Sequence, residues 1–121
     1  MKRDMDLVRK ILLAIEGHDH SRAPKQIKLK GYADEQIQFH VWLMGRAGLL
    51  DVSEVSHSLS TSHRAIPRNI TWEGYEFLEL ARQDSLWEKA KRKVSEAGAG
   101  LTLDVIKGVL AQLAKEAVGL S

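Results

Sequence analysis

The chain has 121 residues, with 18 Lys and Arg against 16 Asp and Glu, a formal net charge of +2, 44% hydrophobic residues and no cysteine. This length and hydrophobic content fit one domain with a core of ordinary size. The lack of cysteine excludes disulfides, thiolate metal sites and cysteine nucleophiles, and it favours a reducing cytoplasm. No apolar run approaches the roughly 18 residues that span a bilayer, and Asp4 and Asp6 interrupt the place of a signal peptide's apolar stretch. We therefore expect neither membrane insertion nor secretion.

The first predicted elements are a helix and a short strand. Apolar residues recur at helical spacing at Val8, Ile11, Leu12 and Ile15. A helix is therefore expected from its N-cap Asp4 to Glu16, with Gly17 as its stop. Lys25–Lys30 then alternates polar and apolar residues, which predicts a strand with Ile27 and Leu29 facing inward.

A second helix is predicted from Asp34 to Ala47, with Gly48 as its C-terminal stop. Its apolar residues form two stripes with a tryptophan between them: Ile37, Val41 and Met44 on one side, Phe39 and Leu43 on the other, and Trp42 between. A helix that is apolar on nearly all sides is normally buried on nearly all sides. We expect this helix to contact more than one neighbouring helix or a second subunit.

A β-hairpin is predicted after the second helix. Leu49–Val55 has a strand-like pattern, and Ser56–Arg64 is polar, lacks acids and suits a hairpin tip. Ile66–Ile70 is expected to return beside the first strand, with Pro67 indicating an edge position. Thr71 is the predicted N-cap of the helix that follows.

Three helices are predicted in the remainder of the chain. In the first, the residues expected to face the core are Trp72, Tyr75, Leu78 and Ala81. It should end near Gln83, where Ser85 and Glu88 form a capping-box pattern for a second helix that runs to about Glu96. After a flexible joint at residues 97–100, Thr102 should cap the last helix. The side of that helix expected to be buried consists of Ile106, Val109, Leu110, Leu113 and Ala117.

This order of elements predicts a mostly α fold with a small β-hairpin (α+β). It is a single domain, with a winged helix-turn-helix-like core at residues 1–83 and a C-terminal helical extension at residues 84–121. Phe39–Leu50 resembles the recognition helix, and its exit into the wing, of small bacterial winged-helix repressors. Where such repressors have a short helix before the recognition helix, Lys25–Lys30 reads as a strand. The helix-turn-helix is therefore expected to be incomplete.

Three separated motifs also resemble a bacterial and prophage family of unknown function. They are the opening Met1–Leu12, the central Ile70–Leu78 and the Trp87–Lys91 run. The resemblance implies a small cytoplasmic protein that is often phage-encoded. It implies no known activity and therefore supplies no functional residues.

Binding of double-stranded DNA, as in a transcriptional regulator, is the first functional hypothesis. Candidate base contacts are Gln36, Gln38, His40 and Arg46. Candidate phosphate contacts are Arg22, Lys25, Lys28, Lys30, His63, Arg64 and Arg68. The basic residues before the second helix lie in the acid-free stretch 20–33, and those of the hairpin lie in the acid-free stretch 55–72. Against this reading, Asp34 and Glu35 at the start of the second helix would repel phosphates.

A non-enzymatic protein-interaction role without nucleic acid is the rival hypothesis. Phe39 and Trp42 are its candidate contacts, either in a homodimer or with a host or phage protein. Ordinary core packing explains most of the other aromatic residues equally well. The basic cluster Lys89–Lys93 is better explained as a solvated helix face than as a second binding site.

Catalytic and metal chemistry find little support in the sequence. His18-Asp19-His20 is better read as a surface turn than as a metal site, because a site needs three or four convergent ligands. The chain has no phosphate-binding glycine loop, serine elbow or paired carboxylate motif. We therefore expect neither an enzyme nor a cofactor or metal.

Overall fold

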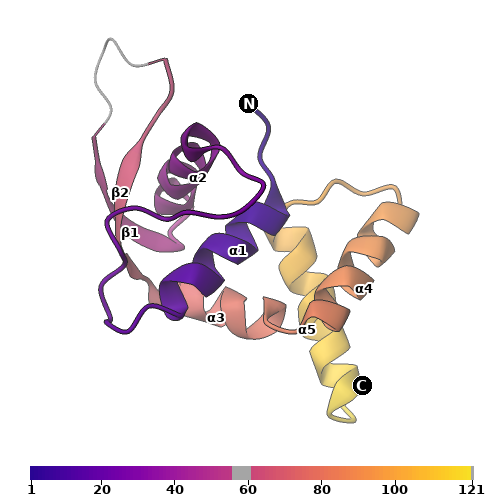
Figure 1. Cartoon of the computed structure of the whole chain (residues 1–121). Helices are drawn as coiled ribbons and strands as arrows, with labels where there is room; N and C mark the ends of the chain where they lie inside the picture. Colours follow the sequence, from indigo (N-terminus) through magenta and orange to yellow (C-terminus); the bar gives the residue numbers. More distant parts are fainter. Residues whose placement is uncertain (56–60, 121) are drawn as a thin grey trace. The chain divides into compact units, whose positions relative to one another are not determined.

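The computed structural model describes residues 1–55 and 61–120. In these ranges the fold is mostly helical with one antiparallel hairpin, which confirms the predicted α+β class (Figure 1). The elements are α1 (Met5–Glu16), α2 (Asp34–Arg46), β1 (Leu50–Glu54), β2 (Ala65–Ile70), α3 (Trp72–Ala81), α4 (Asp84–Glu96) and α5 (Leu103–Ala117). The chain divides into two compact units, Met1–Tyr75 and Glu76–Ser121. The division into a core at residues 1–83 and an extension at residues 84–121 stays a prediction.

Helix α1 has the boundaries and the buried face that its sequence predicts. The Asp4 carboxylate accepts a hydrogen bond from the Leu7 N–H at 3.1 Å and so caps the first turn. The side chains at 7, 8, 11, 12 and 15 are all buried. The helix ends at Gly17, whose N–H donates to the Leu13 carbonyl at 3.0 Å.

The segment between α1 and α2 contains no strand, so the prediction for Lys25–Lys30 is wrong. It passes as an irregular chain alongside the hairpin and α2 (Figure 1). Ile27 is buried as expected, whereas Leu29 is only half-buried. A strand requires a ladder of hydrogen bonds with a neighbour. A main-chain hydrogen bond links this segment to β2 at one point, from the Ala23 N–H to the Arg68 carbonyl at 2.7 Å.

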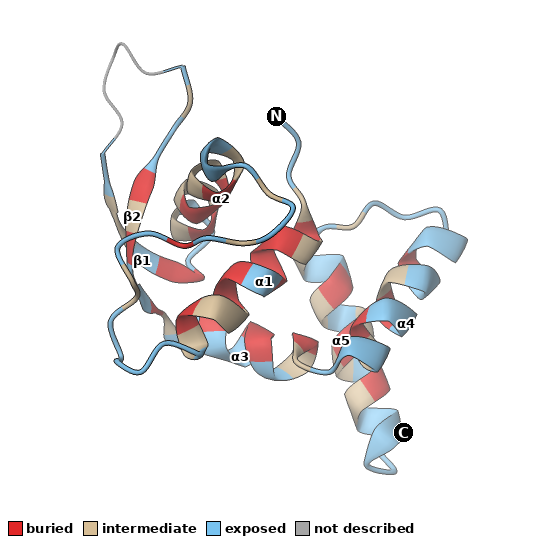
Figure 2. Cartoon of the chain, in the orientation of Figure 1, coloured by how far each residue is buried: buried red, intermediate tan, exposed pale blue. Residues whose placement is uncertain are grey.

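Helix α2 is buried on one side rather than on nearly all sides. Its stripe of Ile37, Val41 and Met44 lies in the core, whereas Phe39, Trp42 and Leu43 are half-buried (Figure 2). The helix ends as predicted at Gly48, whose φ of +81° is a left-handed conformation that glycine adopts readily. The Gly48 N–H donates to the Gly45 carbonyl and the Leu49 N–H donates to the Met44 carbonyl, which together form a Schellman motif.

The hairpin pairs β1 with β2 in antiparallel register, from Leu50 opposite Ile70 to Glu54 opposite Ala65. A bulge between Asp51 and Val52 shifts this register. Part of the predicted hairpin tip, residues 56–60, lies outside the described residues. At the base of the hairpin, the missing side chain of Gly45 lets α2 approach closely, because a Cβ there would lie 2.5 Å from the Val52 Cγ2 atom.

Thr71 links the end of the hairpin to the start of α3. Its hydroxyl donates to the Gly48 carbonyl at 2.6 Å and accepts from the Gly74 N–H at 3.0 Å, which confirms the predicted cap. The prediction that Trp72 and Tyr75 face the core is wrong, because these side chains are 76% and 42% exposed. Gly74 takes the inner position instead. A Cβ on Gly74 would lie 2.1 Å from the Leu49 carbonyl oxygen.

The second unit packs α4 against α5. The Phe77 and Trp87 rings meet edge to face, with centroids 6.1 Å apart.

Thr102 caps α5 as predicted, by accepting from the Val105 N–H at 3.1 Å. Three other predictions need correction. Helix α4 begins at Asp84 after Gln83 and has no side-chain cap, so Ser85 is not the N-cap. In α5, Ile106, Leu110 and Leu113 are buried, but Val109 is only half-buried, and Ala117, the last residue of the helix, is exposed.

Across the described residues, no helix combines the length and the apolar character needed to cross a bilayer.

Candidate nucleic-acid interface

A pocket of about 330 Å³ lies in the first unit, between the segment before α2, the helix α2 itself and the hairpin. Its lining residues come from four separate parts of the chain: Lys25, Gln26, Ile27, Asp34, Ile37, Gln38, Val41, Val55, Arg64, Ala65, Ile66 and Pro67. Two of these side chains are cations, Lys25 and Arg64, and both are exposed. The lining therefore combines buried apolar residues with basic groups that solvent can reach.

The two acid-free stretches of the sequence meet at this pocket. Lys25 belongs to the first stretch and Arg64 to the second, and both line the pocket. The two stretches are also joined by the main-chain hydrogen bond from the Ala23 N–H to the Arg68 carbonyl at 2.7 Å, and Arg22 directly precedes Ala23. We refer to Arg22, Lys25, Arg64 and Arg68 as the basic surface. All four side chains are exposed.

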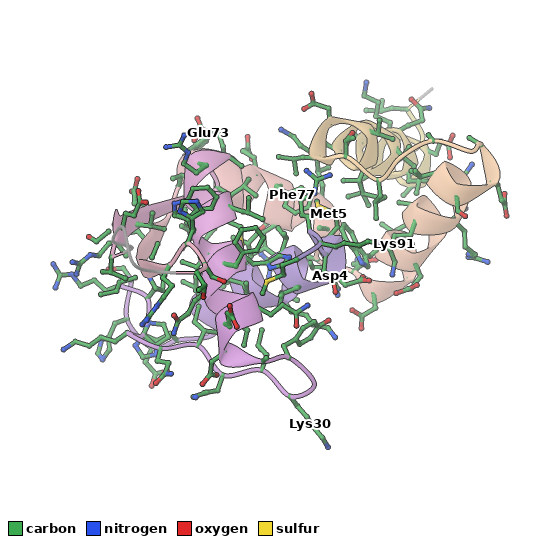
Figure 3. The ribbon with its side chains drawn as sticks, turned by 90° about the horizontal axis from the view of Figure 1, so that it is seen from above. Asp4, Met5, Lys30, Glu73, Phe77 and Lys91 are labelled. Carbon is green, nitrogen blue, oxygen red and sulfur yellow. The ribbon has the colours of Figure 1, made fainter. Side chains whose placement is uncertain are left out.

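Two of the other predicted phosphate contacts are placed less favourably. The Lys28 ammonium is 2.6 Å from the Asp34 carboxylate, so an exposed ion pair offsets its charge. Lys30 projects away from the rest of the first unit (Figure 3). Neither side chain joins the basic surface.

His40 is not a base contact, and this prediction is wrong. Its side chain is 0% exposed. The ring Nε2 accepts from the Asp4 N–H at 2.8 Å, so Nδ1 carries the proton and donates to the Gln36 carbonyl, also at 2.8 Å. His40 therefore ties the start of α1 to α2, and its polar atoms are not available to a ligand.

The remaining predicted base contacts do not form one reading face. Gln38 turns toward the hairpin and lines the pocket. Gln36 is half-buried, and the exposed Arg46 has its guanidinium 5.7 Å from the centroid of the Trp42 ring. A recognition helix presents several adjacent side chains to the major groove. Helix α2 presents few adjacent polar side chains that could enter a groove.

The returning limb of the hairpin covers the outer side of α2. His63 stacks on Trp42, with ring centroids 3.9 Å apart and planes 7° from parallel. Ser62 donates a hydrogen bond to Glu35, which lies about two turns before Trp42 on α2. The Trp42 Nε1 atom is buried without a hydrogen-bond partner among the described residues. These contacts occupy the side of α2 that a DNA reader would insert into a groove.

The candidate protein contacts lie on the same covered side. Phe39 stacks on Trp42, with ring centroids 6.0 Å apart and planes 20° from parallel. Both side chains are half-buried. Because His63 already lies against Trp42, the surface open to a partner there is smaller than the sequence suggested.

Sequence reasoning missed two features. The pocket was not foreseen, because its lining comes from segments whose contact no local pattern reveals. The exposed aromatic pair Trp72 and Tyr75 was assigned to the core. A usable signal was Gly74 between them, since a glycine inside a helix often marks a close approach of two backbones.

His18 and His20, the two histidines of the turn after α1, lie next to each other. The rings of His18 and His20 meet edge to face with centroids 5.5 Å apart. Within residues 1–55 and 61–120, no group of three or more His, Cys, Asp or Glu side chains is arranged to hold a metal ion.

Comparison with known proteins adds relatives but no activity. Residues 2–100 match the model of a family described as hypothetical protein (DUF2513). An uncharacterized protein from Haemophilus influenzae is 33% identical over 110 residues, which cover 90% of this chain and 92% of that protein. No solved structure matches the chain. The relatives therefore indicate neither a winged-helix fold nor a function for this chain.

Proposed function

We propose that this chain, which belongs to the DUF2513 family, is a small cytoplasmic protein that binds double-stranded DNA mainly through the phosphate backbone. The observation that carries the proposal is the meeting of the two acid-free stretches in the basic surface. Arginine and lysine contacts to phosphates supply most of the affinity of sequence-independent DNA binding.

The contacts of α2 make backbone binding a better proposal than reading of a specific operator. Base readout needs side chains that enter a groove. His40 is buried, and His63 and Ser62 occupy the outer side of the helix next to Trp42 and Glu35. The acidic Glu35 on that side would also oppose a close approach to phosphates. A regulatory role would therefore require a selectivity that does not come from α2.

The test is the salt dependence of binding to a short duplex, measured by fluorescence anisotropy with the full chain. The triple variant Arg22→Gln, Lys25→Gln and Arg68→Gln removes three exposed charges of the basic surface. The logarithmic slope of affinity against salt is about 0.9 per phosphate contact. If each side chain contacts one phosphate, the slope of the variant should be shallower by roughly 2 to 3.

A matched control removes the same charge elsewhere. Lys89, Arg92 and Lys93 are exposed on α4, and their replacement by glutamine changes the net charge equally. This control should keep the wild-type slope. Equal losses in both triple variants would mean that net charge, and not the basic surface, governs binding. No binding even at low salt would refute DNA binding.

A protein-interaction role is the second candidate, and the exposed Trp72 and Tyr75 favour it. These side chains are 76% and 42% exposed and lie three residues apart on α3. Tryptophan and tyrosine are enriched among residues that dominate binding energy at protein interfaces. The double variant Trp72→Ala and Tyr75→Ala should abolish self-association, or capture of a purified partner, if this role holds. It should leave DNA affinity unchanged.

A further inference from the structure

We propose that the pocket beside α2 binds a phosphomonoester, and that its source is the 5′-phosphate at an end of duplex DNA. The inference deepens the proposed DNA-binding function and rests on it for the identity of that source. It assigns a ligand class to a pocket of about 330 Å³ lined by Lys25, Gln38 and Arg64. This volume lies at the lower end of the range of small-ligand sites.

The charges that line the pocket match a dianion. Lys25 and Arg64 contribute two positive charges, and Asp34 contributes one negative charge. Lys28 lies 2.6 Å from that carboxylate and offsets it. The formal charges of these four side chains sum to +2. A phosphomonoester carries roughly −1.5 to −2 at neutral pH, whereas a phosphodiester within the duplex carries only −1.

The other polar groups of the pocket also suit a phosphate. The arginine guanidinium offers paired donors to phosphate oxygens, and the lysine ammonium acts as a point charge. Gln26 and Gln38 add side-chain amides that can donate to further oxygens. Ile27, Ile37 and Val41 are the buried apolar residues of the lining, and they exclude water from the part of the pocket that they border.

The composition of the lining argues against recognition of a nucleobase. Proteins bind unpaired bases largely by stacking them on aromatic side chains. The described residues that line this pocket include no aromatic residue. The pocket should therefore take the phosphate of any end sequence.

The shape favours a terminal phosphate over an internal one. The lining residues belong to α2, to the hairpin and to the segment before α2, so the pocket has walls from several elements. Internal phosphodiesters lie along the outside of the double helix with a sugar on either side. A terminal phosphate has one such connection and can enter a concave site.

The experiment compares two duplexes of the same sequence, one with 5′-phosphates and one with 5′-hydroxyls. We expect the wild-type chain to bind the phosphorylated duplex at least about tenfold more tightly, which corresponds to roughly 1.4 kcal/mol. Replacement of both Lys25 and Arg64 by glutamine should abolish this preference. The matched variant Arg22→Gln and Arg68→Gln should weaken binding of both duplexes and keep the preference.

A third variant, Gln38→Trp, fills the pocket without changing its charge. It should lose the preference for the phosphorylated end while keeping the salt dependence of binding. Circular dichroism would check that each variant is folded. Because Lys25 and Arg64 are exposed, their variants should retain the fold.

Two outcomes separate this inference from the proposed function. If wild-type protein binds both duplexes equally, the end-recognition inference fails and backbone binding stands. If no duplex binds, DNA binding fails, and the shift in melting temperature caused by dAMP, against deoxyadenosine, then tests the pocket alone. A shift for dAMP that is absent in the variant lacking Lys25 and Arg64 would support the phosphomonoester site with a free nucleotide as its source. No shift would overturn the site.

Discussion

The imidazole of His63 lies flat against the indole of Trp42, with ring centroids 3.9 Å apart and an interplanar angle of 7°. This contact joins the returning limb of the hairpin to the outer side of α2, and the Glu54 carboxylate is 3.9 Å from the His63 Nδ1 atom. Stacked aromatic pairs contribute about 0.5 to 1.5 kcal/mol beyond the area they bury. This ring pair and the hydrogen bond from Ser62 to Glu35 should therefore both help to attach the hairpin limb to α2.

Replacement of His63 by alanine should lower the free energy of unfolding by about 1 kcal/mol. Urea denaturation, followed by circular dichroism, measures the change. His20→Ala is a matched control, because His20 lies in the exposed turn after α1. A double-mutant cycle with Trp42→Leu isolates the pair, and a coupling energy near zero would show that the stack contributes nothing in solution.

Replacement of His40 by leucine should destabilise the first unit by about 1 to 3 kcal/mol. Leucine keeps the apolar contacts but leaves the Asp4 N–H and the Gln36 carbonyl without their partner, and His40 is fully buried. The control is His18→Leu at an exposed position, where changes usually stay within about 0.5 kcal/mol. If both variants have the same stability, the hydrogen bonds of His40 to Asp4 and Gln36 do not stabilise the fold.

Replacement of Gly74 by alanine should cost about 1 to 3 kcal/mol, because the new Cβ would lie 2.1 Å from the Leu49 carbonyl oxygen and 2.7 Å from the Ile70 Cγ2 atom. Backbone cannot move aside as a flexible side chain can. Gly108 in α5 is the control, since a Cβ there meets no atom within 4 Å. Gly108→Ala should stabilise the chain by roughly 0.5 to 1 kcal/mol through helix propensity. Melting temperatures that move in the same direction would contradict this pair of expectations.

Replacement of Trp72 by alanine should change stability by less than about 0.5 kcal/mol, because the side chain is 76% exposed. Trp87→Ala should cost about 3 to 5 kcal/mol, since Trp87 is 1% exposed and packs edge to face on Phe77. Thermal unfolding of the two variants checks the assignment of these side chains to surface and core. A large loss for Trp72 would restore its predicted place in the core.

Most helices could be predicted from residues that lie close together in the sequence. Asp4, Thr71 and Thr102 were predicted as caps because a capping side chain bonds to a backbone N–H only a few residues away. The alternation in Lys25–Lys30 is also local, but a strand exists only if another strand pairs with it. Whether Lys25–Lys30 pairs depends on the neighbouring strand β2. That strand pairs with β1 and accepts a hydrogen bond at Arg68 from Ala23, but it forms no ladder with Lys25–Lys30.

The burial of individual side chains and the candidate site were harder to predict. Trp72 and Tyr75 fit a helical stripe, yet the close contact of Gly74 with Leu49 turns them outward. His40 looked like a reader because histidine is polar, although a buried histidine with both nitrogens bonded is equally compatible with the sequence. The acid-free stretches were visible in the sequence. Their meeting at one pocket depends on tertiary contacts that a single sequence does not encode in any local pattern.

The three tryptophans occupy three different surroundings, and this gives the chain its own optical probes. Trp42 and Trp72 lie in the first unit and Trp87 in the second. Trp87 is enclosed and should emit at short wavelength, whereas Trp72 is open to water and should emit at long wavelength. Emission from Trp42 should change when His63 leaves its ring. Single-tryptophan variants would therefore let fluorescence follow the hairpin, the exposed start of α3 and the second unit separately, without any attached dye.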